Sequence, residues 1–216
     1  MKYLSIVLFS LLIFSCKSES KAKVLSAVEI INKSINVSGG KLFDNSIIQF
    51  DFRNNYYSAW RQKGKFGLTR ATGNDTITFI DKLTNDGFSR QVTTKANDYL
   101  KTLVVEDSMV KKYTASVNSV HYFSTLPYGL NDKAVNKTLL GEEKIKEHNY
   151  YKIKVTFSQD GGGEDYEDVF VYWTNKQSFK VDYLAYSYNE EDGVGMRFRE
   201  AYNERYVTRL RFVDYN

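Results

Sequence analysis

The chain has two histidines, His121 and His148, and these are the first side chains to consider for acid–base chemistry. His121 lies in VHYFSTLPYGLND, residues 120–132, which also contains the only proline. A general base needs a nucleophile or a carboxylate within hydrogen-bonding reach, and the neighbouring sequence offers neither. The chain also lacks a nucleophile elbow and a metal-binding histidine pair. We therefore expect no catalytic residue, and a hydrolase that uses His121 stays open as an alternative.

Acidic residues gather in QDGGGEDYED, residues 159–168, around three consecutive glycines. Calcium takes six to eight oxygen ligands from such loops, but this spacing does not match a calcium-binding loop. No phosphate-loop lysine follows the glycines, which argues against a nucleotide site. We interpret the segment as a solvated hairpin tip and expect no cofactor; whether this loop binds a metal stays open.

Arg197 and Arg199 alternate with apolar residues in MRFRE, so one face of an expected strand is basic. A solvent-facing side explains this pattern. The functional alternative is a cavity whose arginines bind a carboxylate, phosphate or sulfate group. Only one of Tyr183 and Tyr186 could join it, because residues three apart on a strand face opposite ways. The other residues that could line such a cavity are Trp60, His121, Tyr122, Phe123, Leu126, Tyr128 and Trp173.

The N-terminus, MKYLSIVLFSLLIFSC, combines a lysine with a short apolar run that ends at Cys16. The run has the length of a signal-peptide core and is too short for a comfortable bilayer span. Its last four residues, IFSC, resemble the bacterial lipobox. The resemblance implies cleavage after residue 15, acylation of Cys16 and a membrane anchor, with residues 16–23 as a tether. Because Cys16 is the only cysteine, disulfides within the chain are excluded.

Length and composition limit the fold classes and partners that are possible for the remainder of the chain, residues 24–216. About 200 residues fit one domain, and we expect a monomer. The 17 tyrosines and 14 phenylalanines, with a single proline, favour a sheet-rich protein. A net charge of +4 and an expected envelope location make a nucleic-acid partner a poor interpretation.

Two segments show helical periodicity. In residues 24–37 the apolar side chains recur at helical spacing and form one stripe, and Gly39 and Gly40 can cap the end of this helix. Residues 95–126 interrupt a series of strands, and within them a second stripe ends before Pro127. The first stripe consists of Val24, Ala27, Val28, Ile31 and Ile35, and the second of Val110, Tyr113, Val117 and Val120.

Strand patterns with short turns flank the central helix. They occupy residues 46–94 and 150–215, where period-two alternation is separated by turn residues such as those at 63–64 and 85–87. We predict an α+β protein in which an antiparallel sheet curls into an unclosed barrel, with an N-terminal helix and a central helix that acts as a lid.

This order of elements behind a lipobox resembles the LolA/LolB-like fold of periplasmic lipoprotein carriers. The segments HYFSTLPYGLND and GVGMRFREAYNERY are also similar to a family of uncharacterised Bacteroidota lipoproteins. The resemblance implies a half-barrel with helices on its concave side, and no carrier residue transfers by motif.

We therefore expect a lipid-anchored outer-membrane protein that faces the periplasm and binds a lipid or another amphipathic molecule without catalysis. The alternative is an envelope assembly protein that binds protein partners.

Overall fold

The computed structural model describes residues 24–161, 166–190 and 193–216. Its described elements are two α-helices, two short 3₁₀ helices and twelve strands in two antiparallel sheets of six strands each. In both sheets every strand pairs with its neighbour along the chain. The predicted α+β class is confirmed, including the unclosed antiparallel architecture and the two helices; the strands form two sheets rather than one.

The first sheet is a meander of hairpins joined by short turns. Positive φ angles at Arg53 and Asn54, and at Lys63 and Gly64, allow the two-residue turns that match strand twist. The second of these turns lies where the sequence predicts it. The strands of the first sheet are β1 (Asn45–Phe52), β2 (Asn55–Gln62), β3 (Lys65–Gly73), β4 (Ile77–Thr84), β5 (Gly87–Thr94) and β6 (Asn97–Leu103).

The second sheet repeats this meander, with strands of more varied length, from six residues in β9 and β12 to 15 in β11. Register shifts interrupt three of its pairings, between β7 and β8, β9 and β10, and β11 and β12, and such shifts bend a sheet. Its strands are β7 (Val135–Ile145), β8 (His148–Phe157), β9 (Phe170–Asn175), β10 (Val181–Glu190), β11 (Gly193–Val207) and β12 (Leu210–Tyr215).

Helix α1 (Ala27–Val37) begins with a complete capping box between Ser26 and Glu29. Gly39 follows its end with a φ of 127°, and the 3₁₀ helix η1 (Gly40–Asp44) leads into β1. The predicted stripe is partly wrong: Val24 and Val28 are exposed, whereas Ile30 is buried. The buried face is therefore rotated around the helix from the predicted one.

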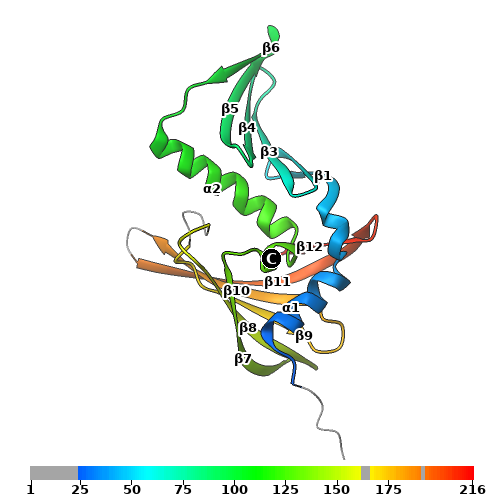
Figure 1. Ribbon diagram of the computed structural model, residues 1–216. Helices are drawn as coiled ribbons and strands as arrows, with labels where there is room; N and C mark the ends of the chain where they lie inside the picture. The colour runs from blue at the N-terminus through cyan, green and yellow to red at the C-terminus, as the bar shows by residue number, and fades with distance from the viewer. Residues whose placement is uncertain (1–23, 162–165, 191–192) are drawn as a thin grey trace, which may run out of the picture.

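Helix α2 (Asp107–Ser124) starts later than the predicted interruption, because β6 first extends the first sheet. The helix ends before Pro127, as predicted, and the 3₁₀ helix η2 (Tyr128–Asn131) follows. Figure 1 shows α2 between the two sheets, with α1 against the second sheet.

The main core lies where α1 and the end of α2 cover the second sheet. It joins Ile30 and Ile31 of α1 to Ile153, Tyr172 and Leu184 of the sheet. A smaller cluster of Ala59, Leu68 and Val117 holds α2 to the first sheet. Because α2 takes part in both clusters, it links the two sheets and positions the groups described next.

Candidate functional site

The face of the first sheet that meets α2 carries one transverse row of side chains. Direct cross-strand pairing aligns Phe50, Tyr57, Arg70, Asp81 and Arg90 on β1 to β5. Apolar residues continue on the same face in the rows on both sides of this one, with Ala59, Leu68 and Phe88 in one row and Phe79 in the other. We call the contact between this face and α2 the α2 seam; it comprises Phe50, Tyr57, Ala59, Leu68, Arg70, Phe79, Asp81, Phe88, Arg90, Tyr113, Ser116, Val117 and His121.

A charge cluster occupies the middle of the seam. Asp81 has no exposed side-chain surface and lies between Arg70 and Arg90, which are 13% and 14% exposed. Arg70 donates from Nη2 to Asp81 Oδ2 at 2.7 Å, and its Nη1 donates to Ser116 Oγ of α2 at 2.7 Å. Arg90 donates from Nη2 to Asp81 Oδ2 at 3.3 Å, and its Nε lies 2.8 Å from Asp81 Oδ1 as an ion pair without hydrogen-bond alignment. Two guanidiniums thus share one carboxylate, which leaves one surplus positive charge.

Aromatic rings surround this surplus charge. The Arg90 guanidinium carbon lies 3.8 Å from the ring centroid of Tyr113 on α2 and 5.2 Å from that of Phe79. Phe88 stacks on Tyr113 with centroids 6.0 Å apart. The Tyr113 and Phe79 rings stabilise the cation through cation–π attraction, and all three rings are only partly buried. The seam thus combines a cationic centre with an apolar border.

His121 lies at the other end of the seam and is buried. Its ring contacts Phe50 and Tyr57 edge to face, and its Nε2 is 3.1 Å from the carbonyl oxygen of Thr69. Because a carbonyl only accepts, Nε2 carries the proton in the neutral ring. Burial, with a smaller contribution from the charge of Arg61, lowers the pKa of His121 to about 4. No carboxylate or nucleophile of the described chain bonds to the ring, so the geometry favours a packed core residue.

The end of α2 inserts aromatic rings into the second sheet. Tyr122 Oη and Tyr172 Oη are 2.9 Å apart, and burial raises the pKa of both hydroxyls. Phe123 packs against Phe170 and Tyr186, and Leu126 is buried in the same core. The space beneath this end of α2 is therefore filled by side chains.

Tyr128 belongs to a separate polar cluster outside the α2 seam. Its hydroxyl donates to Asp44 at 2.7 Å, and its ring lies under the Arg61 guanidinium at 5.3 Å. Burial, with the bond to Asp44, raises the pKa of Tyr128 to about 12. Burial also lowers the pKa of Arg61 and raises that of Asp132. This cluster ties η1, β2 and η2 together.

The structure separates the predicted ligand-binding residues into four groups. His121, Tyr122, Phe123, Leu126 and Tyr128 share the end of α2 and the turn after it. Trp60 lies on β2, Trp173 on β9 and the two arginines on β11, so the structure does not bring all the predicted residues together.

Each tryptophan lies on the face of its sheet that points away from α2. Trp60 neighbours Ala59, whose side chain points toward α2, and it covers Gly67 on the other face. Trp173 neighbours Tyr172 of the core and packs with Tyr150 and Tyr183 on the outer face of the second sheet. The prediction that Tyr183 and Tyr186 face opposite ways is confirmed, since Tyr186 faces the core and Tyr183 faces outward.

Arg197 and Arg199 lie on β11, opposite Tyr186 and Leu184 of β10. The Arg197 guanidinium lies 4.6 Å from the ring centroid of Tyr188 and is exposed. Neither arginine lies at the seam. Of the predicted site residues, His121 lies there, whereas the charged residues at its centre, Arg70, Asp81 and Arg90, were not predicted.

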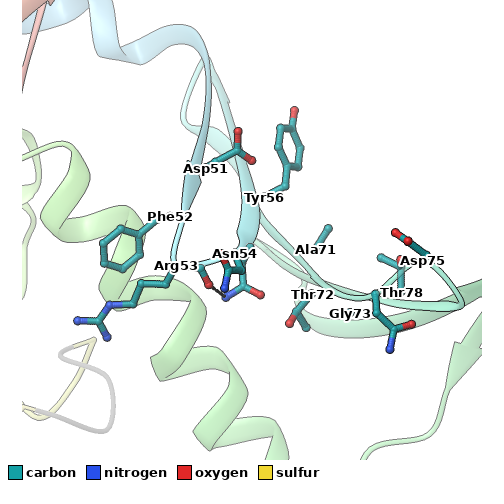
Figure 2. Close-up of a pocket in the computed structure, with 12 residues that line it drawn as sticks. Asp51, Phe52, Arg53, Asn54, Tyr56, Ala71, Thr72, Gly73, Asp75 and Thr78 are labelled. Atoms are coloured by element: carbon teal, nitrogen blue, oxygen red, sulfur yellow. Dashed lines mark hydrogen bonds between the residues drawn. The ribbon is translucent and has the colours of Figure 1, made fainter.

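A polar pocket of about 510 Å³ opens beside the β1–β2 and β3–β4 turns. Figure 2 shows Phe52 and Arg53 on the α2 side of β1, with Asp51 and Tyr56 on the opposite side. Its Asn74 side chain already accepts from the amides of Thr76 and Ile77. The pocket contains no predicted site residue, and its wide opening offers little shelter for an apolar ligand.

Two predictions fall partly or wholly outside the described residues. Cys16 and its tether precede residue 24, and the acidic glycine segment includes residues 162–165. Within the described ranges, no group of three His, Cys, Asp or Glu side chains could hold a metal ion. Neither described helix is long and apolar enough to cross a membrane.

Comparison with protein families gives a match over nearly the whole chain. The family of unknown function DUF6503 matches residues 2–216. The chain belongs to this family. No curated protein matches the DUF6503 chain.

Solved structures resemble the DUF6503 chain at low identity. A LolA superfamily protein from Nitrosomonas europaea is 12% identical, with a TM-score of 0.40 over 85% of this chain and 80% of that one. A DUF1329 family protein from Desulfovibrio piger is 9% identical, with a TM-score of 0.44 over 88% and 84%. A putative outer membrane lipoprotein-sorting protein domain from Vibrio parahaemolyticus is 10% identical, with a TM-score of 0.39 over 74% and 67%.

Sequence reasoning missed Arg70, Asp81 and Arg90, although a signal was present. Each lies two residues from an apolar residue of the seam, for example Arg70 from Leu68 and Asp81 from Phe79. Period-two alternation places such residues on the same face. The pattern therefore indicates charged side chains on the apolar faces of three consecutive strands, and the register of the strands places them opposite one another.

Proposed function

We propose that this DUF6503 protein is a non-enzymatic, lipid-anchored envelope protein that binds an anionic amphipathic molecule at the α2 seam. The observation that carries the proposal is the surplus positive charge at Arg70 and Arg90, held among aromatic rings next to a fully buried Asp81. A carboxylate or phosphate head group would neutralise that charge, and its apolar chain would lie along the neighbouring rings.

The physical basis is the low dielectric of the seam. A guanidinium interacts more strongly with an anion where water is partly excluded, and its planar donors match a carboxylate or a phosphate. Both arginines retain some exposure, so a head group reaches them without unfolding the sheet. Apolar chains gain about 0.8 kcal/mol per buried methylene, which favours an amphiphile over a small anion.

The contacts of His121 do not suit a catalytic residue. Its described contacts are two aromatic rings and one backbone carbonyl, and its lowered pKa keeps the ring neutral near pH 7. A neutral ring enclosed in this way contacts no group that it could activate. These contacts support a binding protein over a hydrolase.

Photo-crosslinking tests whether an anionic amphiphile binds at the α2 seam. The full-length chain is incubated with palmitate carrying a diazirine, or with the corresponding uncharged alcohol, and the labelled peptides are mapped by mass spectrometry. Palmitate should label α2, β4 and β5. In Arg70→Met/Asp81→Leu/Arg90→Met, which removes the cluster without leaving an unpaired charge, palmitate labelling should fall at least tenfold.

The alcohol and an exposed arginine provide the controls. Labelling by the alcohol should be weak and equal in both proteins, and Arg205→Met, at an exposed ion pair, should label like the wild type. Equal labelling by palmitate in the wild type and the triple variant would show that the seam arginines do not bind the head group.

The anchor makes a separate prediction. If Cys16 is acylated, cells grown with an alkyne analogue of palmitate should yield labelled protein in the outer-membrane fraction. Cys16→Ala should lose the label, since the chain has no other cysteine. Equal labelling of the variant would contradict lipidation at this position.

A further inference from the structure

Part of β11 has one unpaired edge. Residues Gly193 to Glu200 pair with β10, whereas pairing with β12 begins only at Ala201. Asn216 bonds to the backbone of Glu200 on that outer side. Among the described strands, none pairs with the outer edge of residues 193–199.

The backbone groups on this edge are defined by strand alternation. The amide of Glu200 donates to Asn216, and its carbonyl accepts from the Asn216 amide. Every second residue turns the same way in an antiparallel strand. The amides and carbonyls of Phe198, Met196 and Val194 therefore point outward, ready to bond to another strand. The Arg199 guanidinium reaches the Phe198 carbonyl at 3.4 Å, a weak contact that an incoming amide can replace.

The side chains on this edge are unusually exposed for their type. Val194, Met196 and Phe198 are 69%, 83% and 53% exposed and share one face of β11. Arg197 and Arg199 share the opposite face. A natural sheet edge is usually shielded against strand addition, and an exposed apolar edge favours it.

We propose that the outer edge of residues 193–199 binds an extended peptide segment of a partner protein by strand addition. The segment would alternate apolar residues, next to Val194, Met196 and Phe198, with acidic residues, next to Arg197 and Arg199. Cross-strand pairs of opposite charge are stabilising and like charges are not. A second copy of this chain is a poorer occupant, because it would place its own two arginines on the same face. The inference does not depend on a ligand at the α2 seam.

Fluorescence anisotropy with the full-length chain in neutral phosphatidylcholine nanodiscs tests the proposal. The probes are a labelled peptide TVEVEVEVT and its counterpart TVKVKVKVT, which has the same strand propensity and opposite charge. The glutamate peptide should bind at least tenfold more tightly. Arg197→Glu/Arg199→Glu should reverse this preference, which a merely structural role of the arginines would not produce.

Two substitutions at Met196 test whether its outward backbone amide bonds to the peptide. Met196→Pro removes an amide that points outward and is not used by the fold, and proline is tolerated at such edge positions. It should lower the affinity for the glutamate peptide at least tenfold, whereas Met196→Ala, which keeps the amide, should lower it less. A glutamate peptide methylated on alternate nitrogens should lose binding to the unaltered chain, so the result does not rest on one variant.

Three outcomes would overturn the proposal: equal binding of both peptides, undiminished binding by Met196→Pro, or undiminished binding of the methylated peptide. A wild-type dimer in analytical ultracentrifugation that Met196→Pro dissociates, together with no peptide binding, would assign the edge to a second copy instead.

Discussion

Replacing Asp81 with asparagine is expected to lower the free energy of unfolding by about 3–5 kcal/mol, because it leaves two partly buried guanidiniums without their shared counter-ion. The charge-free triple variant Arg70→Met/Asp81→Leu/Arg90→Met should be far closer to the wild type, since no buried charge remains unpaired. Urea unfolding monitored by circular dichroism measures both values.

The matched control is Asp214→Asn, which breaks the exposed ion pair with Arg205. Exposed pairs contribute about 0–1 kcal/mol, so this variant should differ little from the wild type. If Asp81→Asn costs no more than Asp214→Asn, the cluster does not carry the buried charge that we assign to it.

The second large effect concerns pH and His121. Burial lowers the pKa of His121 from 6.5 to about 4 in the folded chain. Between these two values the unfolded chain binds more protons than the folded chain, so stability is present above pH 6.5 and is lost as the pH falls toward 4. The loss is on the order of 3 kcal/mol.

His121→Gln should remove this part of the pH dependence, because glutamine does not titrate and still offers a donor to the Thr69 carbonyl. Unfolding free energies measured from pH 4 to pH 7 for both proteins test this, and His148→Gln shows the effect of losing an exposed histidine. Identical slopes for the wild type and His121→Gln would mean that His121 has the same pKa in the folded and the unfolded chain.

The order of elements could be predicted from the sequence because local patterns determine it. Turns such as the one at Lys63 and Gly64 need residues that accept a positive φ, and these stand out in the sequence. Pro127 marks the helix end because it lacks an amide hydrogen. Strand β6 was missed because it is an edge strand with exposed Tyr99 and Leu100, which produce no clear inward and outward alternation.

The candidate site was harder to predict because periodicity gives two faces of a strand without showing which face is inside. Trp60 and Trp173 each adjoin a residue that points into the protein, so both point out. The charged row at Arg70, Asp81 and Arg90 depends on the register of three strands, and only the assembled sheet shows that these residues stand opposite one another.

Native mass spectrometry of the full-length chain, extracted gently from its own membranes, tests most directly whether the α2 seam binds an anionic amphiphile. The wild-type chain should carry one anionic amphipathic molecule, and the triple variant Arg70→Met/Asp81→Leu/Arg90→Met, extracted in the same way, should lose it. A wild-type chain without any bound molecule, or a bound molecule that the triple variant retains equally, would contradict the account.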